Sequence, residues 1–80
     1  VGYAEKNSFD RAWSDGDFWN FSFRTNANRT IQLFDATGRL IVSASSSEKL
    51  FSTSAQEFPH GVYLYQISEG HNMYSGKLIK

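Results

Sequence analysis

Cysteine is absent from this sequence of 80 residues, and proline occurs only once. Without cysteine, neither disulfide bonds nor thiolate-bound zinc can stabilise the fold, so the packing of side chains must do so. An excess of charge of one sign is absent too, because eight basic residues balance eight acidic ones. Nucleic acids are therefore not expected as partners. Long apolar runs are also missing, so we expect no direct insertion into a membrane, which needs roughly 20 apolar residues in a helix.

Aromatic residues, by contrast, are abundant. Two Trp, four Tyr and seven Phe residues make up 16% of the chain. A domain of this length buries only roughly 60% of the surface that its unfolded chain exposes, so each large side chain in its core matters. We expect residues 1–80 to form a single domain with a core of aromatic rings.

Alternation of apolar and polar residues predicts β-strands, because successive side chains of a strand point to opposite faces. Trp19, Phe21 and Phe23 fall on one face of the clearest strand, and we predict that this face is buried. The sequence Asp35-Ala36-Thr37-Gly38 predicts a hairpin, since Asp accepts hydrogen bonds from amides ahead of it and Gly adopts positive φ. The predicted strands cover residues 2–5, 18–24, 30–35, 39–44, 48–53, 62–68 and 73–80.

Six or seven short strands separated by turns favour an all-β, immunoglobulin-like antiparallel β-sandwich, with a small barrel as the alternative. Residues 62–68 have branched and aromatic side chains on both faces, which predicts a central strand. Residues 48–53 predict a short edge strand with Leu50 and Phe51 facing inward. Between residues 6 and 17, aromatic residues that favour burial alternate with turn-forming Asp and Gly, and no strand is predicted there.

Catalytic or metal-binding constellations are not evident. His60 and His71 both lie in predicted turns, and neither has the further ligands that zinc requires. No nucleophile turn or oxyanion loop accompanies the many serines. Asp15-Gly16-Asp17 resembles part of a calcium loop but lacks its other carboxylates, so we interpret it as a solvated turn. We therefore predict a protein that is not an enzyme and uses no cofactor.

Three motifs occur in order in the second half of the chain. Residues 31–41 contain Asp-x-x-Gly-Arg, residues 58–64 contain Phe-x-x-Gly-Val-Tyr, and residues 76–80 read Gly-Lys-Leu-Ile-Lys. Each motif is weak alone, but their order and spacing together resemble the C-terminal sorting domain of type IX secretion cargo, over about residues 30–80.

The resemblance implies an immunoglobulin-like sandwich that acts as an export signal in Bacteroidetes-type bacteria. It implies transit through the periplasm, recognition by outer-membrane components of the type IX secretion system, and delivery to the cell surface. There a sortase removes the domain from many members, whereas others retain it. We expect the machinery to recognise the folded shape, for instance by adding a strand to an exposed edge formed by the last strand. Such an edge also permits strand exchange in a homodimer.

The residues that the motifs indicate fall into two groups. They are Asp35, Gly38, Arg39, Gly61, Tyr63, Lys77 and Lys80. Asp35 and Gly38 shape a turn, Gly61 allows a sharp bend after proline, and Tyr63 packs on the core, so we interpret these four as structural. The three basic residues have no evident packing role, and contact with a receptor stays open for them.

Two alternatives from other functional classes remain. The domain could be an adhesive or carbohydrate-binding module, with an exposed aromatic stripe as its binding surface. The candidates for that stripe are Trp13, Trp19, Tyr63 and Tyr65. The domain could also be a spacer without any partner, in which case a reporter fused to it would not be exported.

Overall fold

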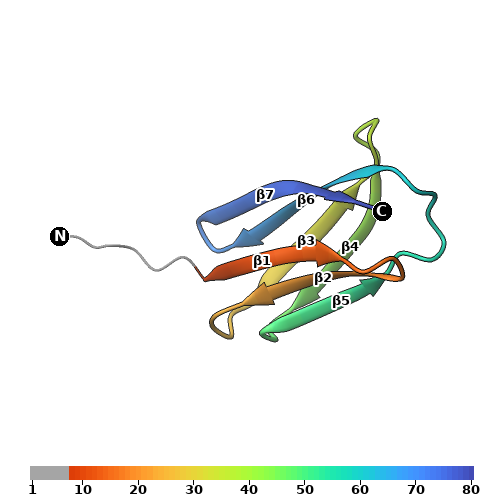
Figure 1. Ribbon diagram of the computed structural model, residues 1–80. Coiled ribbons are helices and arrows are strands. Elements are labelled where there is room, and N and C mark those ends of the chain that lie inside the picture. The colour runs from red at the N-terminus through yellow and green to blue at the C-terminus, as the bar shows by residue number, and fades with distance from the viewer. Residues whose placement is uncertain (1–7) are drawn as a thin grey trace.

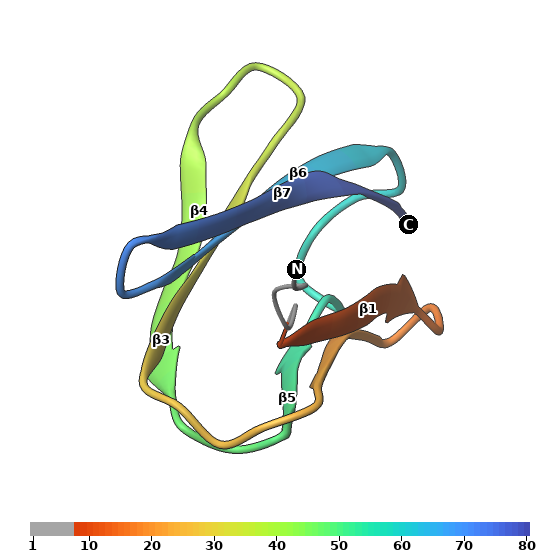
Figure 2. The ribbon, with the colours of Figure 1, turned by 90° about the vertical axis from the view of Figure 1, so that its left-hand side faces the viewer.

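A computed structural model describes residues 8–80 of the chain, which fold into seven antiparallel strands (Figure 1). The strands are β1 (Phe9–Ser14), β2 (Phe18–Phe23), β3 (Arg29–Phe34), β4 (Leu40–Ser46), β5 (Leu50–Ser54), β6 (Val62–Glu69) and β7 (Asn72–Ile79). One sheet has the strand order β1-β2-β5, and the other has the order β4-β3-β6-β7. The two sheets form the layers of a sandwich (Figure 2), which confirms the predicted fold class.

The strand order follows the immunoglobulin pattern closely. In immunoglobulin constant domains, the first, second and fifth strands share one sheet, and the third, sixth and seventh strands share the other. The same division holds here, except that β4 pairs with β3 instead of joining the sheet of β5. Near the start of β6, the Tyr63 hydroxyl donates a hydrogen bond of 2.6 Å to the carbonyl of Pro59. This contact resembles the tyrosine corner of immunoglobulin-like domains.

The core lies between the two sheets and is largely aromatic on one side. Trp19, Phe21 and Phe23 of β2 are buried as predicted, and they face Ile31 and Leu33 of β3. Further buried side chains come from β6 and β7, namely those of Tyr63, Ile67 and Leu78. Because every second residue of β2 and β3 points inward, two short strands provide about half of the buried apolar side chains.

The strand β1 is not predicted by the sequence. Its pairing with β2 shifts between Phe9 and Arg11, so Asp10 forms a bulge. Because of this bulge, Phe9 and Ala12 both pack on the core although they are three residues apart. That spacing hides the strand from a search for period-two alternation. The predicted strand at residues 2–5 lies outside the described residues.

The edge and central positions of the other strands match the predictions, with one error in orientation. β6 is central, between β3 and β7, and β5 is an edge strand. Phe51 of β5 packs against the core, but Leu50 is 58% exposed. The predicted burial of Leu50 is wrong, because neighbouring residues of a strand point to opposite faces and the larger ring of Phe51 occupies the inner one.

Arg29 is the one charged residue that is buried among residues 8–80. Its guanidinium lies 3.9 Å from the ring centroid of Phe23, and its Nε lies 2.9 Å from Oε1 of Glu69. It also donates hydrogen bonds to three backbone carbonyl groups, those of Thr25, Ala27 and Glu48. A single side chain thus joins the β2–β3 loop, the β4–β5 loop and the end of β6.

The carboxylate of Glu69 is stabilised in its charged form. Hydrogen bonds from the Ser8 hydroxyl and from Arg29, with the charge of Arg29, hold the pKa of Glu69 below its ordinary value despite burial. Because the pKa of Glu69 is lower in the folded protein than in the unfolded one, its charged carboxylate stabilises the fold at pH values above the unfolded-state pKa. This contribution is lost as the pH falls through the folded-state pKa. Acidification should therefore weaken this end of the sandwich.

Replacing Glu69 with glutamine (Glu69→Gln) should lower the free energy of unfolding by about 2 to 3 kcal/mol at neutral pH, because a buried guanidinium loses its counter-charge. Urea unfolding measures this loss, and the difference from the wild type should shrink on acidification. Asp10→Asn is the matched control, since the ion pair of Asp10 with Arg24 is exposed and its removal should cost at most about 1 kcal/mol. Equal losses for the two variants would contradict this account.

Gly76 of β7 lies opposite Tyr65 of β6, whose ring covers it. A Cβ atom on Gly76 would lie 2.5 Å from the Tyr65 hydroxyl oxygen and 2.7 Å from the adjacent ring carbon. The glycine therefore provides the space in which this aromatic ring packs. Pairs of this kind, with an aromatic ring over a glycine on the neighbouring strand, help to hold the register of a sheet.

Gly76→Ala should lower the free energy of unfolding by about 1 to 3 kcal/mol, because the added methyl group collides with the ring. Combining it with Tyr65→Leu should cost clearly less than the sum of the two single changes, since the smaller side chain removes the collision. Chemical denaturation of the four proteins of this cycle measures the coupling. Additive losses would show that the ring and the glycine do not interact as described.

Candidate recognition surface

The three sequence motifs meet at one end of the four-stranded sheet. Phe34 of β3 pairs with Leu40 of β4 on one side and with Leu64 of β6 on the other, and Leu64 pairs with Lys77 of β7. These four residues form one row across all four strands, on the outer face of the sheet. The hairpin, the start of β6 and the end of β7 are therefore neighbours in space although they span half of the sequence.

The hairpin between β3 and β4 has the predicted geometry. Oδ1 of Asp35 accepts hydrogen bonds of 3.0 Å from the amides of both Thr37 and Arg39. The Asp35 carbonyl accepts a bond from the amide of Gly38, which has a φ of 92°. A side-chain acceptor and a residue with positive φ together close a type I turn with a bulge. Asp35 and Gly38 have the turn-forming roles predicted for them.

The charge of Asp35 is engaged within the turn. A hydrogen bond from the Thr37 hydroxyl, another from the Arg39 amide and the charge of Arg39 hold the pKa of Asp35 below its ordinary value. Nε of Arg39 lies 3.3 Å from Oδ2 of Asp35, while the Arg39 side chain is 79% exposed. Arg39 thus combines an ion pair with a surface that solvent or a partner can reach.

Gly61 and Tyr63 hold the start of β6 in place. Gly61 exchanges two backbone hydrogen bonds with Lys80, of 2.8 and 3.1 Å, and so extends the pairing of β6 and β7 by one residue at this end. The ring of Tyr63 is buried and lies 4.8 Å from the ring of Trp19. Tyr63 therefore packs on the core, as expected.

Lys80 contacts other parts of the fold, although the sequence indicates no packing role for it. Its Nζ donates hydrogen bonds of 2.5 Å to the carbonyls of Ala55 and Phe58, in the loop between β5 and β6. The expectation is wrong because the β5–β6 loop, more than 20 residues earlier in the chain, brings these carbonyls to the end of β7. Lys77, by contrast, is exposed on the outer face.

Several exposed apolar side chains near the motifs are missed by the sequence analysis. The exposed side chains are those of Leu40 (47% exposed), Val62 (41%), Leu64 (40%) and Ile79 (67%). Phe34 lies among them and is half-buried. Val62 pairs with Ile79 beside the row of Leu40, Phe34, Leu64 and Lys77. Residues 62–68 have apolar side chains on both faces, and this pattern predicts that both faces are buried. In the structure, only one face of β6 is covered.

The free edge of β7 is a second notable feature of this end. Gly61 and Lys80 form a hydrogen-bonded pair, and such pairs alternate along an antiparallel ladder. The backbone N–H and C=O groups of every second residue of β7 therefore point away from β6, namely those of Met73, Ser75, Lys77 and Ile79. Within the described residues, β7 has no strand partner on that side.

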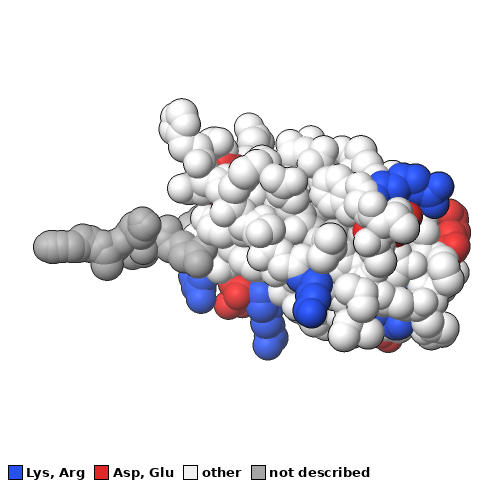
Figure 3. Space-filling view, turned by 90° about the horizontal axis from the view of Figure 1, so that it is seen from above, with Lys and Arg blue, Asp and Glu red and all other residues white. Residues whose placement is uncertain are grey.

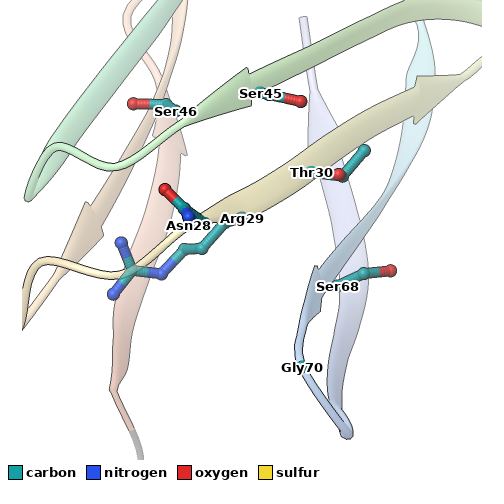
Figure 4. Close-up of a pocket in the computed structure, with 7 residues that line it drawn as sticks. All are labelled: Asn28, Arg29, Thr30, Ser45, Ser46, Ser68 and Gly70. Atoms are coloured by element: carbon teal, nitrogen blue, oxygen red, sulfur yellow. The ribbon is translucent and has the colours of Figure 1, made fainter.

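The other half of the outer face is polar apart from Met73, which pairs with Ser68 and is 62% exposed. A shallow groove of about 380 Å³ is lined by Asn28, Arg29, Thr30, Ser45, Ser46, Ser68 and Gly70 (Figure 4). The hydroxyl groups of Thr30, Ser45 and Ser68 come from three neighbouring strands in register. None of the lining residues is aromatic, so the groove has no platform on which a sugar ring could stack.

The aromatic stripe considered for carbohydrate binding is not formed. Trp19 and Tyr63 are buried, and Trp13 and Tyr65 are only partly exposed. Within residues 8–80, no group of three His, Asp or Glu side chains is placed to hold a metal ion. The same residues contain no helix that is long and apolar enough to span a membrane.

Comparison with protein families gives a match to the model of the secretion system C-terminal sorting domain, over residues 16–80. None of the curated proteins compared with the chain matches it. The matched residues include β2 to β7 and all three motifs. The family is non-catalytic, and its members are sorting signals of the type IX secretion system, which carries proteins across the outer membrane. This chain belongs to the family of type IX secretion C-terminal sorting domains.

Proposed function

We propose that outer-membrane components of the type IX machinery recognise this domain in the periplasm by pairing a strand with the free edge of β7. The parent protein then passes to the cell surface or the medium. We propose that residues 1–80 act together as the export signal. The family match begins at residue 16, but β1 completes the three-stranded sheet. Strand addition supplies affinity through backbone hydrogen bonds, and nearby side chains add specificity.

A comparison of the four sheet edges within residues 8–80 carries this proposal. The edge strand β1 has a bulge at Asp10, and β4 has one at Ile41. β5 has only five residues, whereas β7 has eight and pairs with β6 without any shift in register. Bulges and short strands are devices that protect edges against unwanted pairing. β7 lacks both, so it is the edge best suited to accept a further strand.

Lys80 supports this edge by positioning it. Its ammonium group joins the end of β7 to the β5–β6 loop, and its backbone pairs with Gly61. The last residues of β7 are therefore held straight beside β6. At the other end of β7, the ring of Phe9 from β1 lies 5.5 Å from the ring of Tyr74. The stretch around Lys77 and Ile79 lies away from this contact and is the part that we assign to recognition.

Two further partners follow from the same exposed edge. A surface sortase would meet the domain after translocation, with β7 released by the machinery. A second copy of the domain could also pair with β7 or exchange it, since an unprotected edge accepts any compatible strand. We propose that the machinery competes with such pairing in the periplasm.

Lys77→Pro tests the edge directly in residues 1–80 fused to an exported reporter in a type IX-competent host. Proline removes the outward N–H of residue 77 and leaves the bonds to β6 intact, because proline is tolerated where an edge N–H faces solvent. We expect reporter outside the cell to fall about tenfold, as the loss of one hydrogen bond of roughly 1.4 kcal/mol implies. Lys77→Ala keeps the N–H and should retain most of the export.

The matched control is Ser52→Pro on the edge strand β5, compared with Ser52→Ala, because both variants lose the hydrogen bond of the Ser52 hydroxyl to Asn20. Only proline also removes the amide of residue 52, which points away from the partner strand because Phe23 and Lys49 form a hydrogen-bonded pair. Thermal unfolding of the isolated domains checks that both proline variants fold. Normal export of Lys77→Pro, or an equal loss for Ser52→Pro, would contradict recognition through β7. A wild-type fusion that stays inside the cell would contradict an export role.

A further inference from the structure

The side chain of Tyr65 reaches from the central strand β6 to the edge strand β7. Tyr65 pairs in register with Gly76, and the end of its ring lies directly beneath the glycine on the inner face of the sheet. A Cβ atom on Gly76 would lie 2.5 Å from the Tyr65 hydroxyl oxygen, so only glycine leaves room for the hydroxyl there. Neighbouring strands lie about 4.8 Å apart. The hydroxyl of a residue in β6 is therefore about one strand spacing from a strand added beside β7.

This hydroxyl has no hydrogen-bond partner among residues 8–80. The Tyr63 hydroxyl, by contrast, donates to the Pro59 carbonyl. Within the same residues, the indole nitrogen of Trp19 is the one side-chain polar atom that is both fully buried and without a partner, so the Tyr65 hydroxyl retains contact with solvent. Burial raises the pKa of Tyr65, which keeps the hydroxyl protonated and able to donate at neutral pH.

The hydroxyl lies between the two sheets, on the side where their edge strands β7 and β1 are neighbours (Figures 1 and 2). The ring of Phe9 occupies this seam near the start of β7, 5.5 Å from the ring of Tyr74 and 5.8 Å from that of Tyr65. Figure 3 looks down on β6 and β7, and its centre is largely uncharged. Because Lys77 is the one charged residue of β7, charge gives a partner strand little to recognise, and a free hydroxyl gives it more.

We propose that Tyr65 is a specificity-determining residue, whose hydroxyl donates a hydrogen bond to a side-chain oxygen of the secretion-machinery strand that pairs with β7. The acceptor is a side chain, because the backbone groups of an added strand point along the sheet and not beneath it. Gly76 bonds to β6, so in an antiparallel pair the residue opposite it lies at a non-hydrogen-bonded position, with Cα atoms about 4.5 Å apart. The inference rests on the proposed function and deepens it, because it names a feature of the partner.

Packing within the domain does not require the hydroxyl. The ring of Tyr65 makes edge-to-face contacts with the rings of Phe9 and Phe21, and phenylalanine would make the same contacts. A partner strand with an apolar residue opposite Gly76 would cover the hydroxyl and leave it without water or an acceptor, which costs free energy. The hydroxyl therefore selects against such strands and in favour of those with an oxygen acceptor at this position.

Tyr65→Phe in residues 1–80 fused to the exported reporter tests the inference, because it removes the donor and keeps the ring. The midpoint of thermal unfolding of the isolated domain should not fall, since no described residue loses a hydrogen bond. Reporter outside the cell should fall about fivefold, which corresponds to about 1 kcal/mol for one net hydrogen bond. Tyr74→Phe is the matched control, because Tyr74 is a half-buried tyrosine of the same seam that packs on Phe9, and its export should be normal.

Two analogues at position 65 separate hydrogen bonding from shape. p-Aminophenylalanine supplies a donor and should restore export, whereas p-fluorophenylalanine has a similar size without a donor and should not. Normal export of Tyr65→Phe, an equal loss for Tyr74→Phe, equal export of the two analogues, or a fall in the stability of Tyr65→Phe overturns the inference. In each case a loss of export for Lys77→Pro leaves recognition through β7 standing, whereas normal export of Lys77→Pro overturns the proposed function itself.

Discussion

The regular antiparallel pairing of β7 with β6 is the constraint on which the rest of this domain depends. The pairing keeps Leu78 in the core, places Gly76 beneath Tyr65 and turns Lys77 and Ile79 outward. Because the ladder has no shift in register, the backbone N–H and C=O groups of every second residue of β7 point away from β6. The strand that completes the fold is thus also the strand that a partner can extend. The fold uses one side of these eight residues, and the recognition that we propose uses the other.

The two ends of the sandwich have different physical characters. At the end where β6 turns into β7, the buried Arg29 forms an ion pair with the partly exposed Glu69 and joins several loops. At the other end, the exposed outer face is largely apolar, and Lys80 donates its hydrogen bonds to loop carbonyls. A buried, satisfied ion pair is costly to break once formed, so it favours one arrangement of the loops. We infer that this end keeps the strands in register for the end at which we propose recognition.

The sequence alone predicts the features that depend on local patterns. Alternation in residues 18–24 and 30–35 identifies β2 and β3 with their buried faces, and Asp35 with Gly38 identifies the hairpin. Features that depend on distant residues are not predictable in this way. The bulge at Asp10 hides β1, and the carbonyls that hold Lys80 come from a loop far away in the chain. The exposed outer face of β6 is missed because apolar residues on both faces predict burial of both.

Amide hydrogen exchange along β7, with and without purified outer-membrane type IX components, tests the central claim most directly. In the free domain, the amides of Ser75, Lys77 and Ile79 should exchange fast, while those of Gly76 and Leu78, which bond to β6, should exchange slowly. Addition of the secretion components should slow exchange at Lys77 and Ile79 in particular. Uniformly slow exchange in the free domain, or exchange at these two amides that the components leave unchanged, would contradict recognition through the edge of β7.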